Sequence, residues 1–124
     1  MSLTIIISAL NEEQNIETVL SRLENQIDEQ GNEVDKERYN IIVVDNGSTD
    51  NSASLVRKFS KQSKLHVGMT YEVVQNIIAA RKSGVREIQE NPLYDKTRLL
   101  AFCDADVAVP ARWVGSILTE FDDR

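Results

Sequence analysis

A chain of 124 residues with 41% hydrophobic and 27% charged residues has the composition of a globular domain, and we expect a single domain over residues 1–124. Its net charge of −6 argues against binding of nucleic acid through a broad basic face, because such binding neutralises many phosphates. The single cysteine, Cys103, excludes a disulfide framework.

No apolar stretch reaches the ~20 residues that span a bilayer. Residues 1–9 lack the basic start and the length of a signal peptide. We therefore expect a cytoplasmic protein, and peripheral attachment to a membrane stays open.

The first unit of the chain is a strand followed by a helix. Residues 3–8 are a short, β-branched apolar run, which is typical of a buried strand. Asn11 stands where we expect a helix to begin, and Gln14 follows at the spacing of a capping box. The buried face of that helix is expected to contain Ile16, Val19, Leu20, Leu23 and Ile27. Residues 28–38 are polar and predict a solvated connection.

The second unit repeats this order. Residues 41–44 predict a strand that ends in the turn-rich segment 45–50. Thr49 or Asp50 is expected to cap the next helix. The buried face of that helix is expected to contain Leu55, Val56 and Phe59. Residues 65–67 predict a short third strand.

The third unit begins with a longer helix over residues 71–89. Its buried stripe is expected to contain Val74, Ile77, Ile78, Val85 and Ile88, with Arg81 on the same stripe. Residues 98–103 predict the last strand, and Pro110 suits the first turn of a final helix. That helix is expected to bury Val114, Ile117, Leu118 and Phe121.

Strands and helices alternate along the whole chain, which predicts an α/β fold with a parallel sheet covered by helices on both faces. Ligands of such sheets gather at the carboxyl ends of the strands. The segments that follow Ser8, Val44 and Cys103 all lie at that edge, so we expect a binding site there.

Asp104 and Asp106 follow the last predicted strand and are separated by one small residue. Two carboxylates at this spacing can face one divalent cation, and Mg²⁺ and Mn²⁺ prefer oxygen ligands. A polar turn that caps the next helix has the same pattern. A metal site and a structural turn therefore both stay open.

Three further groups lie near the expected edge. Asp45 ends a strand, where a carboxylate can accept a hydrogen bond from a ribose hydroxyl or a base N–H. The segment 8–12 offers small residues and backbone amides near a helix start, although capping alone also explains Asn11. Arg81 is a cation on an apolar stripe, which requires either an acidic partner or access to a cleft.

Four stretches, in this order, resemble the amino-terminal half of family-two glycosyltransferases with the GT-A fold. They are residues 5–13 (IIISALNEE), 43–50 (VVDNGSTD), 79–84 (AARKSG) and 102–106 (FCDAD). The resemblance covers almost the whole chain and implies a three-layer, Rossmann-like sandwich with a mostly parallel sheet. It also implies an inverting enzyme that transfers a sugar from a nucleotide diphosphate sugar to an acceptor hydroxyl.

The same resemblance implies roles for individual residues. Ser8 would contact the nucleotide base, Asp45 would bind uracil or ribose, and Arg81 would line the nucleotide pocket. Asp104 and Asp106 would hold a divalent metal, Mn²⁺ or Mg²⁺, together with the donor sugar. The rest of the donor site would contain Asn11, Glu12, Asn46 and Ala105. The donor is expected to be a UDP-sugar, and a GDP-sugar also fits.

The chain departs from the family pattern at three points. Leu10 stands where an aromatic residue often stacks on the base, and Asn46 stands where a second aspartate is common. The family's acceptor-binding half and catalytic base follow the metal motif, so we expect the base beyond Arg124. A truncated chain, a domain of a longer protein and a naturally short relative, each supplying the donor-binding part, all stay open. Three acidic residues follow the motif too closely to replace that base, namely Glu120, Asp122 and Asp123. The resemblance implies an acceptor that is a glycan, a lipid or a protein. It leaves open whether the chain forms a homo-oligomer.

Two alternatives remain. A non-catalytic module that binds nucleotide-sugars would share every motif and lack only the base. A receiver domain of signalling proteins has a similar length and the same alternation of strands and helices. It requires an acidic pair directly after the first strand and a lysine after a later strand, which this sequence lacks. Phosphorylation of Asp45 would support the receiver alternative.

Overall fold

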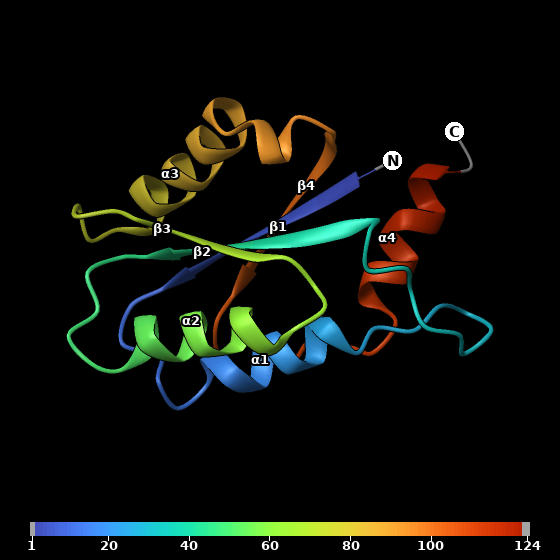
Figure 1. Cartoon of the computed structure of the whole chain (residues 1–124), viewed down its shortest axis with the longest axis horizontal. Helices are drawn as coiled ribbons and strands as arrows, with labels where there is room; N and C mark the ends of the chain where they lie inside the picture. Colours follow the sequence, from blue (N-terminus) through green and yellow to red (C-terminus); the bar gives the residue numbers. More distant parts are fainter. Residues whose placement is uncertain (1, 123–124) are drawn as a thin grey trace.

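The computed structural model describes residues 2–122, and the expected order of strands and helices is present in them (Figure 1). The strands are β1 (Ser2–Ala9), β2 (Tyr39–Asp45), β3 (Val67–Tyr71) and β4 (Thr97–Asp104). The helices are α1 (Ile16–Glu24), α2 (Ser52–Gln62), α3 (Ile77–Glu90) and α4 (Trp113–Asp122), with a 3-10 turn, η1 (Pro92–Tyr94), before β4. Within these residues, no helix combines the length and the apolar character needed to cross a membrane.

The sheet has the order β3-β2-β1-β4, and all of its strands are parallel, which confirms the predicted α/β fold. β1 lies inside the sheet, where Ile5 pairs with Ile41 on one side and with Ala101 on the other. All residues from Leu3 to Ile7 are buried, as a run of apolar and β-branched side chains requires of a strand covered on both faces.

Helices cover both faces of the sheet, with α1 and α2 below it and α3 above it in Figure 1. The larger core lies on the face of α1 and α2, where Ile5 and Ile7 belong to one cluster with Leu20 and Val56. The smaller core lies under α3 and contains Ile6, Ile42, Val44, Ala80 and Tyr94. Each large apolar side chain buried in this way stabilises the fold by about 1.5–3 kcal/mol.

α4 confirms most of its predicted buried face. Val114 and Leu118 are buried in the larger core and Ile117 is partly buried, whereas Phe121 is 39% exposed. The connection over residues 28–38, which we expected to be solvated, buries Val34 beside α4.

The predicted start of the first helix is wrong. α1 begins at Ile16 and has Asn15 as its N-cap, rather than Asn11. Asn11 has a left-handed backbone with a φ of 55°, which a right-handed helix does not contain. Its side chain accepts hydrogen bonds from Thr49 and Asp50 instead.

The predicted cap of the second helix is also wrong, by one or two residues. Asn51 is the N-cap of α2, rather than Thr49 or Asp50. The Asp50 carboxylate still accepts a hydrogen bond from the backbone N–H of Ser52 at 2.9 Å, so it satisfies one donor of the first turn.

The third unit differs most from its prediction. The helix expected from residue 71 begins at Ile77, and Asn76 caps it by accepting a hydrogen bond from the N–H of Ala79. Residues 72–76 are not helical, and β3 occupies Val67–Tyr71 rather than residues 65–67.

The fully buried face of α3 is made of small residues, and of the predicted stripe only Val85 and Ile88 pack, partly buried, against the smaller core. Its buried residues are Ala80, Ser83 and Gly84. Ile77 and Ile78 are 42% and 64% exposed. A Cβ atom at Gly84 would lie 2.6 Å from Cγ2 of Ile6, so the helix approaches β1 too closely for larger side chains. Val74, which precedes the helix, is exposed as well.

Candidate functional site

The carboxyl ends of three strands meet at one edge of the sheet, as predicted. The register places Ser8 beside Asp104 and Ala9 beside Asp45. A cavity of about 340 Å³ opens at this edge. The turns after β1, β2 and β4 and the segment before α3 line it with Ser8, Ala9, Leu10, Glu12, Asn46, Gln75, Asn76, Ile77, Asp104, Ala105 and Asp106. Most of the predicted site residues therefore share one cavity.

This cavity is negatively charged. Glu12, Asp104 and Asp106 line it, and no lysine or arginine of the described residues does. Burial, followed by the charges of Asp104 and Asp106, raises the pKa of the neighbouring Cys103 thiol to about 11. An anionic ligand is repelled by such a cavity unless a cation accompanies it.

The acidic side chains of the cavity fit a cation that brings most of its own ligands. Among the described residues, no donor is hydrogen-bonded to the carboxylate of Asp104 or Asp106. No group of three His, Cys, Asp or Glu side chains in residues 2–122 could hold a metal alone. Mg²⁺ commonly binds one or two carboxylates and takes its other ligands from water and substrate phosphates, which matches this pair.

Asn11 joins the turn after β1 to the turn after β2. Its side-chain oxygen accepts hydrogen bonds from the backbone N–H groups of Thr49 (2.8 Å) and Asp50 (3.3 Å). Its own backbone N–H donates to Oγ of Ser48 at 2.9 Å. Asparagine tolerates the left-handed backbone that this arrangement requires. Asn11 does not line the cavity; it holds the turn that does.

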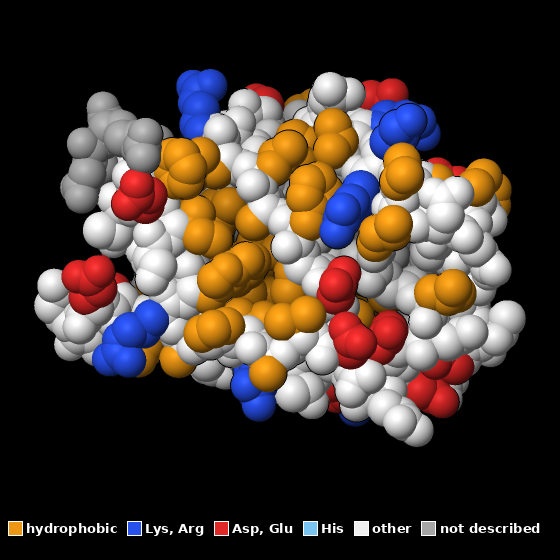
Figure 2. Space-filling view, turned by 180° about the vertical axis from the view of Figure 1, so that it is seen from behind, with side chains coloured by type: hydrophobic (Ala, Val, Ile, Leu, Met, Phe, Trp, Pro, Cys, Tyr) orange, Lys and Arg blue, Asp and Glu red, His pale blue; other side chains and the backbone are white. Residues whose placement is uncertain are grey.

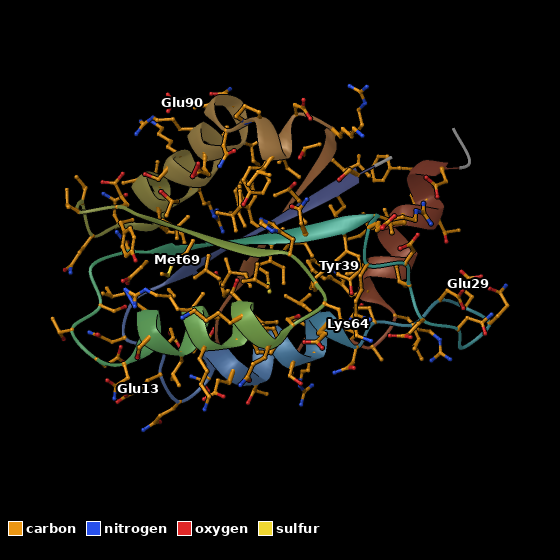
Figure 3. The ribbon with its side chains drawn as sticks, viewed as in Figure 1. Glu13, Glu29, Tyr39, Lys64, Met69 and Glu90 are labelled. Atoms are coloured by element: carbon orange, nitrogen blue, oxygen red, sulfur yellow. The ribbon has the colours of Figure 1, made fainter. Side chains whose placement is uncertain are left out.

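Glu12 and Glu13 extend this connection. The backbone N–H of Glu12 donates to Oγ of Ser52 (2.8 Å), and that of Glu13 donates to Oδ2 of Asp50 (3.2 Å). In return, the Glu13 carboxylate accepts from the N–H of Asn51 at 3.2 Å, and Figure 3 shows Glu13 beside the start of α2. The hydroxyl of Ser52 also bonds to Asp50 and lowers the pKa of that carboxyl. We call residues 11–13 and 48–52 together the cross-loop clamp.

Asp45 lies at the edge of the sheet without lining the cavity. It is 7% exposed, and its Oδ1 accepts a hydrogen bond from the N–H of Ser48 at 3.0 Å. The turn between them passes through Gly47 with a φ of 89°, a left-handed conformation that favours glycine. The contact of Asp45 with uracil or ribose stays a prediction.

Arg81 does not line this cavity, but it lines a neighbouring one, of about 200 Å³, together with Asp104 and Cys103. It is exposed on α3, and its guanidinium carbon is 5.0 Å from the centre of the Phe102 ring on β4, a cation–π contact. It lines a second cavity, of about 430 Å³, together with Ile78, Val85 and Phe102. β4 is an edge strand there, with Leu100 46% exposed, and Figure 2 shows hydrophobic side chains gathered on this side of the molecule.

The structure adds three cavity residues that the sequence did not suggest, namely Gln75, Asn76 and Ile77. We did not predict these three as site residues because we expected a helix from residue 71, which would have contained all of them. The signal that could have revealed them is Asn76 itself, since asparagine is a favoured N-cap and an apolar pair follows it.

Comparison with known sequences identifies the family. The family model described as Glycosyl transferase family 2 matches residues 4–124. Glycosyltransferase AglE of Haloferax volcanii is 28% identical over 111 residues, which are 90% of this chain and 32% of AglE. The putative glycosyltransferase TagX of Staphylococcus aureus is 25% identical over 112 residues, which are 90% of this chain and 29% of TagX.

Solved structures share the fold. S. aureus TarS 1-349 in complex with UDP-GlcNAc aligns with a TM-score of 0.72 at 20% identity, over 99% of this chain and 32% of TarS 1-349. The mannosyltransferase PcManGT from Pyrobaculum calidifontis, in complex with GDP-Man and Mn²⁺, aligns with a TM-score of 0.70 at 23% identity, over 89% of this chain and 29% of the other. The chain thus spans about a third of the length of these relatives. Because the family model matches nearly every residue, the chain belongs to glycosyl transferase family 2.

Proposed function

We propose that this chain binds a nucleotide diphosphate sugar together with a divalent cation in the cavity at the carboxyl edge of the sheet. It would act there as the donor-binding part of an inverting glycosyltransferase. The observation that carries the proposal is the charge of the cavity, whose described lining contains Glu12, Asp104 and Asp106 but no lysine or arginine. A bare diphosphate is repelled by these carboxylates, whereas a diphosphate that carries a divalent cation is not.

In this proposal Asp104 and Asp106 hold the cation, which would be Mn²⁺ or Mg²⁺. When bound, the cation supplies stabilisation of the negative charge that develops on the departing nucleotide diphosphate. The small side chains of Ser8 and Ala105 leave room for the base and the sugar. Asp45 is proposed to bind uracil or ribose, as the family resemblance implies.

The nucleotide is proposed to be uridine or guanosine diphosphate. TarS was solved with UDP-GlcNAc, and the mannosyltransferase was solved with GDP-Man and Mn²⁺. Leu10, which is 40% exposed in the lining of the cavity, offers an apolar surface to either base.

The acceptor side of the reaction is assigned by family resemblance. An acceptor hydroxyl of a glycan, a lipid or a protein would attack the anomeric carbon opposite the diphosphate while a base takes its proton. We place that base beyond Arg124. Asp122 forms an ion pair with Arg38, and Asp123 lies outside the described residues, so neither is proposed for this role.

Calorimetry tests the donor site. UDP-GlcNAc and GDP-Man are titrated into the folded chain with Mn²⁺, with Mg²⁺ and with a chelator. We expect binding only when a divalent cation is present, and the double change Asp104→Asn and Asp106→Asn should abolish it. If the folded wild-type chain binds neither nucleotide with either metal, the proposal is wrong.

An assay of sugar transfer and of donor hydrolysis then separates an enzyme from a non-catalytic module. The assay is run with the chain alone and with a second polypeptide added that corresponds to the part of the relatives the chain does not span. Cation-dependent donor binding without turnover in both cases would favour the module. The receiver-domain alternative is set aside because the chain belongs to a glycosyltransferase family.

A further inference from the structure

Asn46 uses its side-chain amide to bind the backbone of a distant segment. It is 5% exposed, and its Nδ2 donates to the carbonyl oxygens of Glu72 (2.9 Å) and Val74 (2.8 Å). Its backbone N–H donates to the carbonyl of Ala9 at 2.8 Å, which joins the ends of β2 and β1. Both N–H bonds of the amide are therefore made within the protein.

Glu72 holds the same segment from its other side. Its carboxylate accepts hydrogen bonds from the backbone N–H of Val74 (3.0 Å) and from Oγ of Ser83 on α3 (2.5 Å). Its own N–H donates to the carbonyl of Asp45 at 3.0 Å. Gln75 adds a hydrogen bond from Nε2 to the carbonyl of Gly47 at 3.3 Å.

The segment held in this way forms one wall of the cavity. Gln75, Asn76 and Ile77 line the cavity, and they follow directly on the two carbonyls that Asn46 binds. Ile77 is the first residue of α3 and Asn76 is its N-cap, whereas residues 72–75 lie in the stretch without helix or strand between β3 and α3. Apart from the backbone bond of Glu72 to Asp45, side-chain hydrogen bonds hold this stretch to the end of β2, and Asn46 supplies two of them.

We propose that Asn46 is a positioning residue. Its amide holds residues 72–76, and with them the cavity wall formed by Gln75, Asn76 and Ile77, and thereby sets the fit of the donor. This inference rests on the proposed donor site. Asn46 itself also lines the cavity, and because both N–H groups of its amide are bonded to residues 72 and 74, the role proposed here acts through the wall.

The amide is required because it is a double donor. Aspartate, which the family pattern often has at this position, has the same shape but presents only acceptors when it is ionised. A carboxylate at residue 46 would face the carbonyl oxygens of Glu72 and Val74, lose both hydrogen bonds and repel both partners. The change Asn46→Asp should therefore release the wall without altering the volume of the side chain.

The experiment compares nucleotide affinity of the wild-type chain and Asn46→Asp by calorimetry with UDP and Mn²⁺ at pH 8 and pH 5.5. At pH 8 the variant is expected to bind at least about tenfold more weakly, because two hydrogen bonds to the wall are lost. Burial raises the pKa of the introduced carboxyl, and its protonated form can donate one of the two bonds. Part of the lost affinity should therefore return at pH 5.5, relative to the wild-type chain at the same pH.

Two controls separate the wall from other causes. Asn76→Asp places the same extra charge in the same cavity, but it keeps the acceptor that caps α3, so it measures the effect of charge alone. Asn32→Asp makes the same change at an exposed position of the connection before β2. It measures how far an Asn-to-Asp change away from the cavity alters affinity and exchange. A variant at the other anchor, Glu72→Ala, should loosen the wall without touching Asn46.

Hydrogen exchange gives a second readout that needs no nucleotide. The backbone N–H groups of Val74 and Asn76 should exchange faster in Asn46→Asp and in Glu72→Ala than in the wild-type chain, while the strands keep their protection. The inference is overturned if Asn46→Asp leaves affinity and exchange unchanged, or if Asn76→Asp weakens binding as much. Absence of nucleotide binding by the wild-type chain would defeat the proposed donor site, and the exchange rates would still test the wall.

Discussion

The two sides of the proposed donor site are built in different ways. The turns after β1 and β2 are joined by the cross-loop clamp, in which backbone N–H groups of each turn bond to side chains of the other. The turn after β4 makes few hydrogen bonds of this kind. The N–H of Val107 bonds to the carbonyl of Asp104 at 3.3 Å, and no donor in the described part of the chain bonds to the carboxylates of Asp104 or Asp106.

This difference separates stability from binding. The clamp satisfies its polar groups without a ligand, so it is already organised when a ligand arrives. The acidic turn keeps like charges close together, which is unfavourable until a cation binds. Changes in the clamp should therefore lower the free energy of unfolding, and changes in the acidic turn should lower affinity for the nucleotide.

The largest effect is expected in the acidic turn. The double change Asp104→Asn and Asp106→Asn should weaken Mn²⁺-dependent nucleotide binding by at least about 100-fold, because both proposed metal ligands lose their charge. The free energy of unfolding in urea should stay within about 0.5 kcal/mol of the wild-type value, because both side chains are exposed or unpaired. A loss of stability above about 1 kcal/mol would mean that this turn is structural.

A change in the cross-loop clamp should lower the stability of the fold more than the affinity for nucleotide. Asn11→Ala should lower the free energy of unfolding by about 2 kcal/mol, because two backbone N–H groups lose their acceptor and alanine is strained at a φ of 55°. Urea denaturation measures this loss.

The control for Asn11 keeps its acceptor. Asn11→Asp should retain most of the stability, since a carboxylate also accepts from Thr49 and Asp50. Equal losses in the two variants would show that the hydrogen bonds to residues 49 and 50 are not what stabilises the clamp.

Two glycines sharpen the comparison within the turns. Gly47 and Gly31 both have a left-handed backbone, with φ values of 89° and 82°. A Cβ atom at Gly47 would lie 2.7 Å from Nε2 of Gln75, whereas one at Gly31 would have no atom within 4 Å. Gly31→Ala and Gly47→Ala should each cost about 1 kcal/mol of stability, and only Gly47→Ala should also weaken nucleotide binding. Calorimetry and urea denaturation of both variants test this, and equal binding by the two would contradict it.

The smallest effect concerns the thiol beside the acidic turn. The pKa of Cys103, raised to about 11 chiefly by burial and further by Asp104 and Asp106, should fall when Asp104→Asn and Asp106→Asn remove these charges, or when Mn²⁺ binds. The rate of alkylation between pH 8 and pH 10, followed by mass spectrometry, reports the thiolate fraction. An unchanged rate would place the two carboxylates too far from Cys103 to act on it.

Local patterns predicted the sheet and the edge that carries the cavity. The apolar runs of β1 and β2 are dense enough to identify buried parallel strands, and polar residues begin where these strands end. That argument brought Ser8, Asn46 and Asp104 together, because strand ends of a parallel sheet must meet.

Features that depend on contacts between distant segments were not predictable. Asn11 has a sequence context that suits a helix cap, but its partners are Thr49 and Asp50. The large side chains around Ile77 suggested a buried stripe, whereas the close approach to Ile6 selects the small residues of α3. The contact of Arg81 with Phe102 also joins distant segments, and the role of Arg81 in the nucleotide pocket stays a prediction.

The place of β1 in the sheet also affects how the chain folds. Among the described residues, β1 comes first in the sequence and pairs with β4, which comes after the other strands, so that Ile5 must find Ala101. Contacts between residues so far apart in sequence slow folding, to milliseconds or seconds in domains rich in such pairings. Until residues 97–104 have been made, one edge of the most apolar strand has no partner. Recovery of folded protein from the ribosome or from denaturant should therefore depend on how well that exposed edge is kept from aggregating.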